Sequence, residues 1–203
     1  MFDFPAGEKI VQAFVATDTS YLVATKKSFG FIVEPKSLKA QTKAGKQLLN
    51  LVKGDEAGFC IPITGKTVAV LNSDKKLLIY PIDQIPTMSR GKGVKLMNVK
   101  DGEILDILTF TLADGFHMLS SKGNRKRRFP DVSMWVGKRA QVGKLLPHGF
   151  HSGVNFYIPA PEEVIEPEIE EQKSRVDELI NAITEPLPEE DETLDLFADL
   201  DKE

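Results

Sequence analysis

A pattern of two apolar runs, a polar turn and a glycine-containing basic loop occurs three times along this chain, and it constrains the fold more than any other feature. Valine, isoleucine, phenylalanine and threonine are frequent in the apolar runs, which is typical of β-strands. The three copies are residues 21–51, 68–99 and 116–149. One glycine holds the same place in every copy, at spacings of 48 and 50 residues: Gly45, Gly93 and Gly143.

This repeat predicts an all-β fold in which units of about four strands form a propeller-like array. One four-stranded sheet, or blade, cannot bury both of its faces alone, so blades stack side by side. Further apolar runs precede the three copies, at residues 9–17, 58–64 and 103–112. Residues 153–161 look like the same strand at the start of a fourth unit. We therefore expect about three to four blades within residues 1–160, covering part of a ring.

Charge is divided unevenly between this body and the rest of the chain. Residues 161–203 hold 17 of the 30 acidic residues and three of the 26 basic ones, a net charge of −14. The first 160 residues therefore carry a net charge of +10. A basic body favours a polyanionic partner, most often nucleic acid. Lysines that only keep a domain soluble are the alternative.

Several other features limit the function classes. No run of 18 apolar residues is present, so we expect no membrane span, and the N-terminus lacks the pattern of a secretory signal. The single cysteine, Cys60, excludes an internal disulfide framework and favours the reducing cytoplasm. With three histidines in the whole chain, we predict no metal site.

The basic loops are the candidate binding elements. Glycine lets the backbone approach a phosphate closely, and neighbouring lysine or arginine side chains neutralise its charge. Such contacts carry no sequence information and weaken with salt. A solvated turn is the alternative for each loop. The first-choice phosphate contacts are Arg90, Lys92, Lys95, Lys138, Arg139 and Lys144, and the second-choice contacts are Lys43, Lys46, Arg125 and Arg127.

Two segments carry a family resemblance. "KAQTKAGKQLLNL" (39–51) and "LLIYPIDQIPTMSRGKGVKLMNV" (77–99) resemble the C-terminal domains of bacterial type IIA topoisomerase A subunits, above all the topoisomerase IV type. The likeness covers about residues 8–158. It implies a β-pinwheel that binds and bends duplex DNA for strand passage, in the cytoplasm at the nucleoid. It also implies that the partners are the ATPase subunit of the enzyme and the rest of the A subunit, with ATP and magnesium bound in other domains and no cofactor here.

The sequence departs from that family in two places. The gyrase box Gln-Arg-Arg-Gly-Gly-Arg-Gly is absent, and residues 89–95 are a weaker version, which favours the topoisomerase IV type over the alternative, the gyrase type. The DNA-cleaving tyrosine of the family follows an arginine, whereas no tyrosine here does. The chain is therefore expected to be a non-catalytic part of an ATP-dependent enzyme. A propeller that binds other proteins remains a further alternative.

The acidic segment 161–203 is expected to be mostly disordered, because proline and glutamate dominate its start. Apolar residues at helical spacing predict a short helix over 172–184, which ends before Pro186. Near the end, three apolar residues resemble peptides that bind the bacterial sliding clamp: Leu194, Leu196 and Phe197. Acids that compete with DNA for the basic body, and a merely solvated tail, are the other interpretations.

Overall fold

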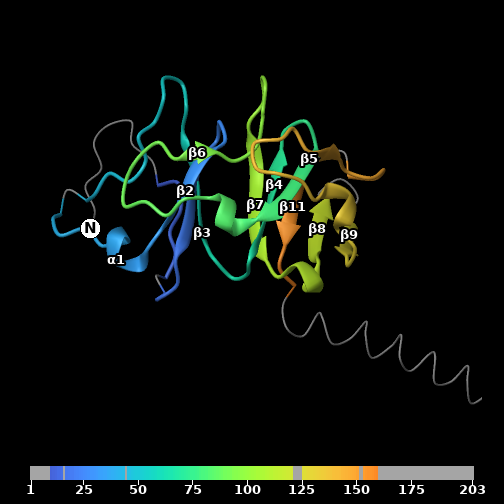
Figure 1. The fold of residues 1–203 in the computed structure, drawn as a ribbon, viewed down its shortest axis with the longest axis horizontal. Coiled ribbons are helices and arrows are strands. Elements are labelled where there is room, and N and C mark those ends of the chain that lie inside the picture. Colours follow the sequence, from blue (N-terminus) through green and yellow to red (C-terminus); the bar gives the residue numbers. More distant parts are fainter. Residues whose placement is uncertain (1–9, 16, 44, 121–124, 151–152, 160–203) are drawn as a thin grey trace, which may run out of the picture. The chain divides into compact units, whose positions relative to one another are not determined.

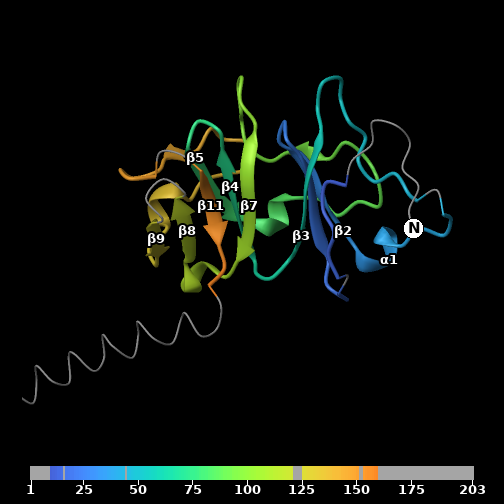
Figure 2. The same cartoon turned by 180° about the vertical axis from the view of Figure 1, so that it is seen from behind.

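The computed structural model describes residues 10–15, 17–43, 45–120, 125–150 and 153–159. These residues form three antiparallel sheets that follow one another in chain order, as Figure 1 shows from one side and Figure 2 from the other. The acidic segment 161–203 lies outside the described residues. So do the helix expected over 172–184 and the three apolar residues expected to bind the sliding clamp.

The sheets contain four, four and three strands. Across the first sheet the order is β3 (Ala57–Pro62), β1 (Tyr21–Thr25), β2 (Phe29–Val33) and β6 (Val94–Lys95). Across the second sheet it is β7 (Ile104–Phe110), β4 (Thr67–Asn72), β5 (Lys76–Pro81) and β10 (Lys144–Leu145). Across the third sheet it is β11 (Val154–Tyr157), β8 (Phe116–Ser120) and β9 (Arg125–Phe129).

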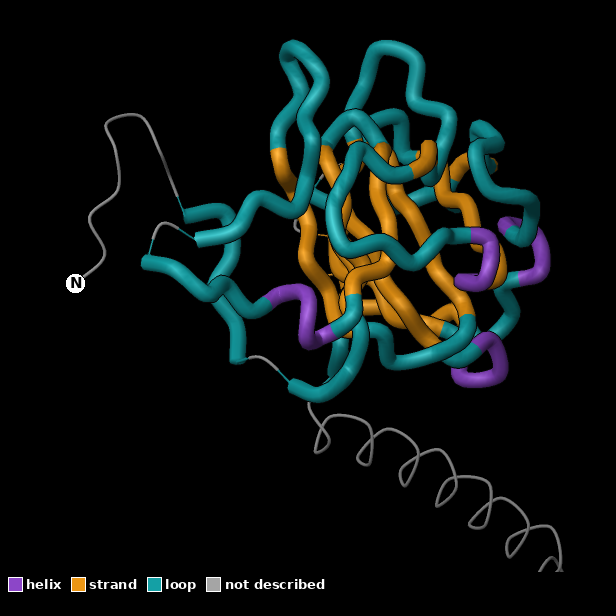
Figure 3. Tube along the Cα trace, turned by 60° about the vertical axis from the view of Figure 1, so that its left-hand side comes forward, coloured by secondary structure: helices purple, strands orange, loops and turns teal. Residues whose placement is uncertain are grey.

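Helices are few and short in the described part of the chain (Figure 3). They comprise α1 (Pro35–Leu38) and three single 3₁₀ turns: η1 (Ile82–Gln84), η2 (Leu112–Asp114) and η3 (Ser133–Trp135). Among the described helices, none has the length and apolarity needed to span a bilayer.

One of the two edge strands of each four-stranded sheet comes from the next copy of the repeat. Strand β6 belongs to the second copy but pairs with β2 of the first, where Val94 lies opposite Gly30. Strand β10 belongs to the third copy and pairs in the same way with β5 of the second, where Lys144 lies opposite Leu77. Each junction between blades is therefore made by backbone hydrogen bonds as well as by apolar contacts.

Two expectations about strands are wrong. Residues 10–15 of the expected run 9–17 form no strand. The run at 153–161 does not open a fourth unit, because β11 pairs with β8 and completes the third sheet. Likewise, β3 and β7 close the sheets of the preceding copies. The described residues therefore form three blades. The expectation failed because an apolar pattern identifies strands but does not specify which strands pair.

Alternating side chains of the central sheet build the core on both of its faces. Val68 and Val70 of β4 join the cluster that contains Leu22 and Ala24 of the first sheet. The residues between and after them, Ala69 and Leu71, join the cluster of the third sheet. Strand β4 is buried along its whole length, as expected for a strand covered on both faces.

Candidate nucleic-acid interface

The three basic loops lie in series, and each contacts the next through backbone hydrogen bonds. We call residues 41–51, 89–99 and 138–149 the first, second and third rim loops. The Gly91 amide donates to the Leu48 carbonyl at 2.9 Å, and the Asn50 amide donates to the Gly91 carbonyl at 2.8 Å. These two bonds join the first rim loop to the second.

The second and third rim loops repeat this contact. The Ala140 amide donates to the Leu96 carbonyl at 3.0 Å, and the Asn98 amide donates to the Gln141 carbonyl at 2.9 Å. Leu96 and Asn98 hold the places in their copy that Leu48 and Asn50 hold in the first. Each rim loop is therefore hydrogen-bonded to the next, and the predicted cations other than Arg125 and Arg127 lie in this continuous series of loops.

The repeated glycines allow β6 and β10 to approach β2 and β5 of the preceding copies. Gly93 and Gly143 both have φ of +77°, in the left-handed region that favours glycine. A Cβ at Gly93 would lie 2.3 Å from the Gly30 carbonyl oxygen, and one at Gly143 would lie 2.6 Å from the Leu77 oxygen. Each glycine therefore fixes where its loop leaves the preceding blade.

The second rim loop presents two exposed cations, Arg90 and Lys92. The Lys92 ammonium lies 4.1 Å from the ring centroid of Phe29, so a cation–π contact orients it. Lys95 is half-buried, and its Nζ donates to Asn98 Oδ1 at 3.3 Å. This loop holds its three predicted contacts within one short segment, two of them open to solvent.

In the third rim loop the three predicted residues differ in their surroundings. Lys138 and Lys144 are exposed. Arg139 is half-buried, and its Nη1 donates to the carbonyl of Lys95 at 2.8 Å. Its backbone amide donates to Gln84 Oε1 at 2.8 Å. Arg139 therefore ties the third rim loop to the second, which leaves less of its guanidinium for a phosphate.

The second-choice residues lie at the two ends of the array. Lys43 and Lys46 are exposed in the first rim loop, where Lys46 Nζ donates to the Ser37 carbonyl at 2.8 Å. Arg127 is exposed on β9, with its guanidinium carbon 4.9 Å from the Phe129 ring centroid. Arg125 lies on the same strand, but its side chain is outside the described part.

Two cations of β9 are not among the predicted phosphate contacts. Lys126 Nζ donates to the Tyr157 hydroxyl at 3.1 Å and lies 4.6 Å from its ring centroid. Arg128 is exposed. Burial, and to a lesser extent the charge of Arg128 on the facing strand, lower the pKa of His117 on β8. Because strand residues alternate between faces, Lys126 and Arg128 lie on the face opposite Arg127. This alternation, which can be read from the sequence, separates the two residues from Arg127.

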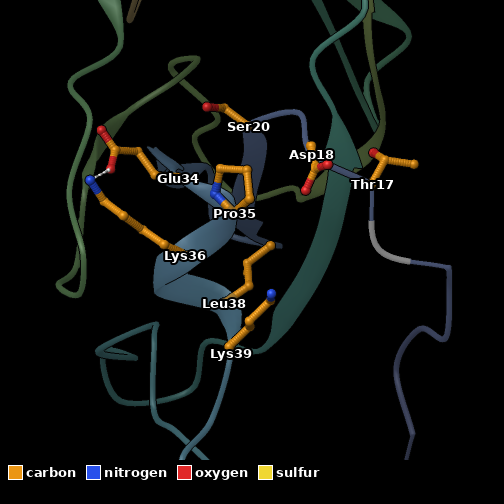
Figure 4. A pocket seen from close by; sticks show the side chains of 8 residues that line it. All are labelled: Thr17, Asp18, Ser20, Glu34, Pro35, Lys36, Leu38 and Lys39. Carbon is orange, nitrogen blue, oxygen red and sulfur yellow. Dashed lines mark ion pairs between the residues drawn. The ribbon is translucent and has the colours of Figure 1, made fainter.

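A pocket beside α1 offers a different kind of site (Figure 4). Glu34 and Lys36 form an ion pair at 2.7 Å on its wall, and the hydrogen bond from Lys36 to Glu34 raises the pKa of Lys36. The residues that line it include neither histidine nor cysteine. Within the described ranges, no group of three or more histidine, cysteine or acidic side chains is placed to hold a metal ion. The three rim loops are therefore the stronger candidate for a functional site.

Comparison with known proteins agrees with the fold. A family described as "DNA gyrase C-terminal domain, beta-propeller" matches residues 20–57 and 76–110. The DNA topoisomerase 4 A subunit of Caulobacter vibrioides is 36% identical over 156 residues, which cover 77% of this chain and 19% of that protein. The Rickettsia felis protein of the same name is 38% identical over 141 residues, covering 69% of this chain and 19% of that protein. The chain therefore spans about one fifth of the length of these curated relatives.

Two solved structures share the architecture. The Escherichia coli ParC C-terminal domain superposes with a TM-score of 0.65 at 20% identity, over 77% of this chain and 68% of that one. A DNA gyrase A C-terminal domain superposes with a TM-score of 0.57 at 16% identity, over 70% of this chain and 51% of that one. At these identities the likeness concerns the fold.

Proposed function

Because the chain belongs to the family of C-terminal β-propeller (β-pinwheel) domains of bacterial type IIA topoisomerase A subunits, we propose that its rim loops bind and bend duplex DNA. The observation that carries the proposal is the hydrogen-bonded succession of the three rim loops. A duplex that follows such an edge meets cations from one blade after another. Bending a site of a few helical turns costs about 1–6 kcal/mol, which the phosphate contacts offset.

The binding is sequence-tolerant and of the topoisomerase IV type. Lysine and arginine contacts to phosphate carry no base information. In the whole enzyme this domain presents a duplex for strand passage, at the nucleoid in the cytoplasm. The remainder of the A subunit and the ATPase subunit carry the DNA-cleaving tyrosine and the binding sites for ATP and magnesium. A sliding-clamp contact through Leu194, Leu196 and Phe197 stays a prediction from the sequence.

A gyrase-type role is the second candidate, favoured by the similarity to the gyrase A C-terminal domain. That role requires a full DNA wrap, whereas the loop at residues 89–95 is less basic than the gyrase box. Wrapping introduces positive writhe into a relaxed plasmid. After nicking and ligation with saturating protein, a topoisomerase IV-type domain leaves the plasmid nearly relaxed, and a gyrase-type domain leaves a ladder of positive topoisomers.

Salt dependence tests DNA binding directly. Neutralising about four phosphates predicts a slope of log affinity against log salt near −3.6, or a loss on the order of 100-fold between about 50 and 200 mM salt. The measurement is fluorescence anisotropy of a labelled duplex with the full chain. A protein-binding propeller predicts no such slope, and absent or salt-independent binding would refute the DNA proposal.

A double variant locates the binding surface. Arg90→Ala combined with Lys92→Ala removes the two exposed cations of the second rim loop, so the slope should become shallower by about 2. Lys27→Ala combined with Lys66→Ala removes the same charge from exposed positions outside the rim loops and serves as the matched control. An equal effect of the two double variants would exclude the rim as the binding surface.

A further inference from the structure

The two faces of the third sheet differ in their chemistry. Residues alternate along each strand, so every second side chain points to the same face. Phe116 and Met118 of β8 pack in the cluster shared with the second sheet. The residues between and beside them point to the other face, which we call the outer face. Each strand contributes two residues to it: His117 and Leu119 of β8, Lys126 and Arg128 of β9, and Asn155 and Tyr157 of β11.

The outer face is polar where the central sheet is apolar. The prolines that follow the two hairpins, Pro81 and Pro130, align the second and third copies, and the strand register then identifies equivalent residues. Four apolar residues of the central sheet have polar counterparts on the outer face: His117 for Ala69, Lys126 for Leu77, Arg128 for Ile79 and Tyr157 for Leu108. A terminal sheet of a stacked array needs a polar face, but solvation does not dictate which polar side chains it carries.

Three planar side chains lie side by side across the outer face. His117 is the direct pairing partner of both Tyr157 and Arg128. A phenol, an imidazole and a guanidinium therefore lie on neighbouring strands, and we call them the planar row. Burial, and to a lesser extent the charge of Arg128, lower the pKa of His117, so its ring is largely uncharged at about pH 7.5. Unpaired bases stack on aromatic rings and on guanidinium planes of this kind.

Two cations accompany the planar row. Lys126 and Arg128 are exposed, and none of the six outer-face residues is acidic. They lie two residues apart on one strand, which separates their Cα atoms by about 6.6 Å, close to the distance between successive phosphates of an extended nucleic-acid strand. Lys126 Nζ donates to the Tyr157 hydroxyl at 3.1 Å and lies 4.6 Å from its ring centroid. Because a cation–π contact at an exposed site is weak, a phosphate can draw this ammonium away from the ring.

The planar row favours unpaired nucleotides over other anions. In a duplex the bases are stacked on one another, so their faces are hidden and only the two cations would be used. An acidic peptide would likewise pair with the cations and leave the planar row without a partner. A single strand presents base faces and phosphates together, and it is the ligand that uses both kinds of group.

We propose that the outer face of the third sheet binds single-stranded DNA, with bases stacked on the planar row and phosphates paired with Lys126 and Arg128. This site is distinct from the rim loops, since the strand of the third rim loop, β10, pairs with the second sheet. The choice of DNA over RNA rests on the proposed function of the chain. The preference for unpaired bases rests on the outer face alone.

A charge-neutral variant tests stacking. Tyr157→Leu introduces the residue type that Leu108 supplies at the equivalent place in the central sheet. The probe is a fluorescein-labelled oligothymidylate of about 12 nucleotides, within the range of site sizes of single-strand binders. With the full chain, Tyr157→Leu should weaken binding of this probe by about tenfold or more and leave the affinity for a duplex unchanged. In NMR spectra of the wild type, the ring protons of Tyr157 and His117 should move upfield as bases stack on them.

A matched pair of arginine variants separates the outer face from general attraction for polyanions. Arg127 and Arg128 are adjacent on β9 and both exposed, but they point to opposite faces of the sheet. Arg127→Gln and Arg128→Gln each remove one positive charge. Arg128→Gln should weaken oligothymidylate binding about fivefold or more beyond the effect of Arg127→Gln, because it also removes a stacking plane.

Several results would overturn the proposal. Tyr157→Leu that binds oligothymidylate as tightly as the wild type, or that weakens the probe and the duplex equally, would show that no stacking site exists. Displacement of the probe by polyglutamate at equal charge concentration would make the face a site for acidic protein segments. Tighter binding of oligouridylate would make RNA the occupant. If duplex binding fails while Tyr157-dependent binding of the probe persists, the rim proposal falls and the outer-face proposal stands.

Discussion

Replacing Gly93 by alanine should destabilise the fold much more than replacing Gly45, although the two glycines have nearly the same backbone conformation. Both lie in the left-handed region, with φ of +77° and +82°. They differ in what surrounds the missing side chain. Gly93 faces the backbone of Gly30 at 2.3 Å, whereas Gly45 faces open space. Comparing the two variants therefore separates the free-energy cost of a strained backbone from the cost of separating β6 from β2.

The magnitudes follow from these surroundings. Alanine in the left-handed region costs about 1–2 kcal/mol at either position. At Gly93 the Cβ also cannot coexist with the Gly30 carbonyl, so β6 must move away from β2. Losing about two backbone hydrogen bonds adds about 2 kcal/mol. We expect a loss of about 3–4 kcal/mol for Gly93→Ala and about 1–2 kcal/mol for Gly45→Ala, out of a total near 5–15 kcal/mol.

Urea unfolding measures this difference. With an m-value near 2 kcal/mol/M, a gap of about 2 kcal/mol separates the two midpoints by about 1 M. Far-ultraviolet circular dichroism is the appropriate signal because it reports on all three sheets. Tryptophan fluorescence would report mainly on the junction of the second and third sheets, where Trp135 lies. Gly143→Ala, with its Cβ position 2.6 Å from Leu77 O, should resemble Gly93→Ala. Equal midpoints for Gly45→Ala and Gly93→Ala would refute the role of close approach.

Two further predictions concern groups whose pKa is raised by burial. Partial burial raises the pKa of the Cys60 thiol from 9.0 to about 11. Alkylation at pH 8 should therefore be roughly 100-fold slower in the folded than in the urea-unfolded chain, as followed by mass spectrometry, and equal rates would contradict the raised pKa. Burial also raises the pKa of Tyr80, whose hydroxyl has no hydrogen-bond partner in the described residues. A raised folded pKa stabilises the fold below the unfolded value near 10.0, and that contribution is lost as pH rises. Tyr80→Phe should therefore unfold no more easily than wild type at pH 7 and lose less stability above pH 10, and equal pH profiles would contradict this.

The repeat in the sequence predicted the all-β array and the equivalence of the three glycines, because both follow from local pattern. It did not predict which strands pair. Residues 94–95 and 144–145 continue the basic loops in sequence, and only the fold shows that they complete the preceding blade. For the same reason β11 looked like the start of a new unit, although it closes the third. Pairing depends on contacts between residues far apart in sequence, which periodicity does not specify.

In the candidate site, too, the sequence predicted some features and only the fold showed others. Lysine and arginine residues near the repeated glycines could be chosen from the sequence, but not their surroundings. Arg90 is exposed, whereas Arg139 is half-buried and bonded to the Lys95 carbonyl. Both lie a few residues before a repeated glycine in a basic loop. What distinguishes them is Gln84 and Lys95 of a neighbouring copy, which lie 55 and 44 residues away from Arg139.

Strand β6 connects the stability of the fold to the proposed DNA binding, because it lies within the second rim loop and completes the first blade. Lys92 and Lys95 flank the point at which the second rim loop joins the first blade. Just beyond it, Ser28 Oγ donates to the Met97 carbonyl and accepts from the Met97 amide, both at 2.8 Å and both buried. A duplex bent along the rim pulls on these junctions with the energy stored in its curvature, about 1–6 kcal/mol in total. Because the junction between the first and second blades combines a strand pair, buried hydrogen bonds and an apolar cluster, we expect it to withstand the bending of DNA that we propose.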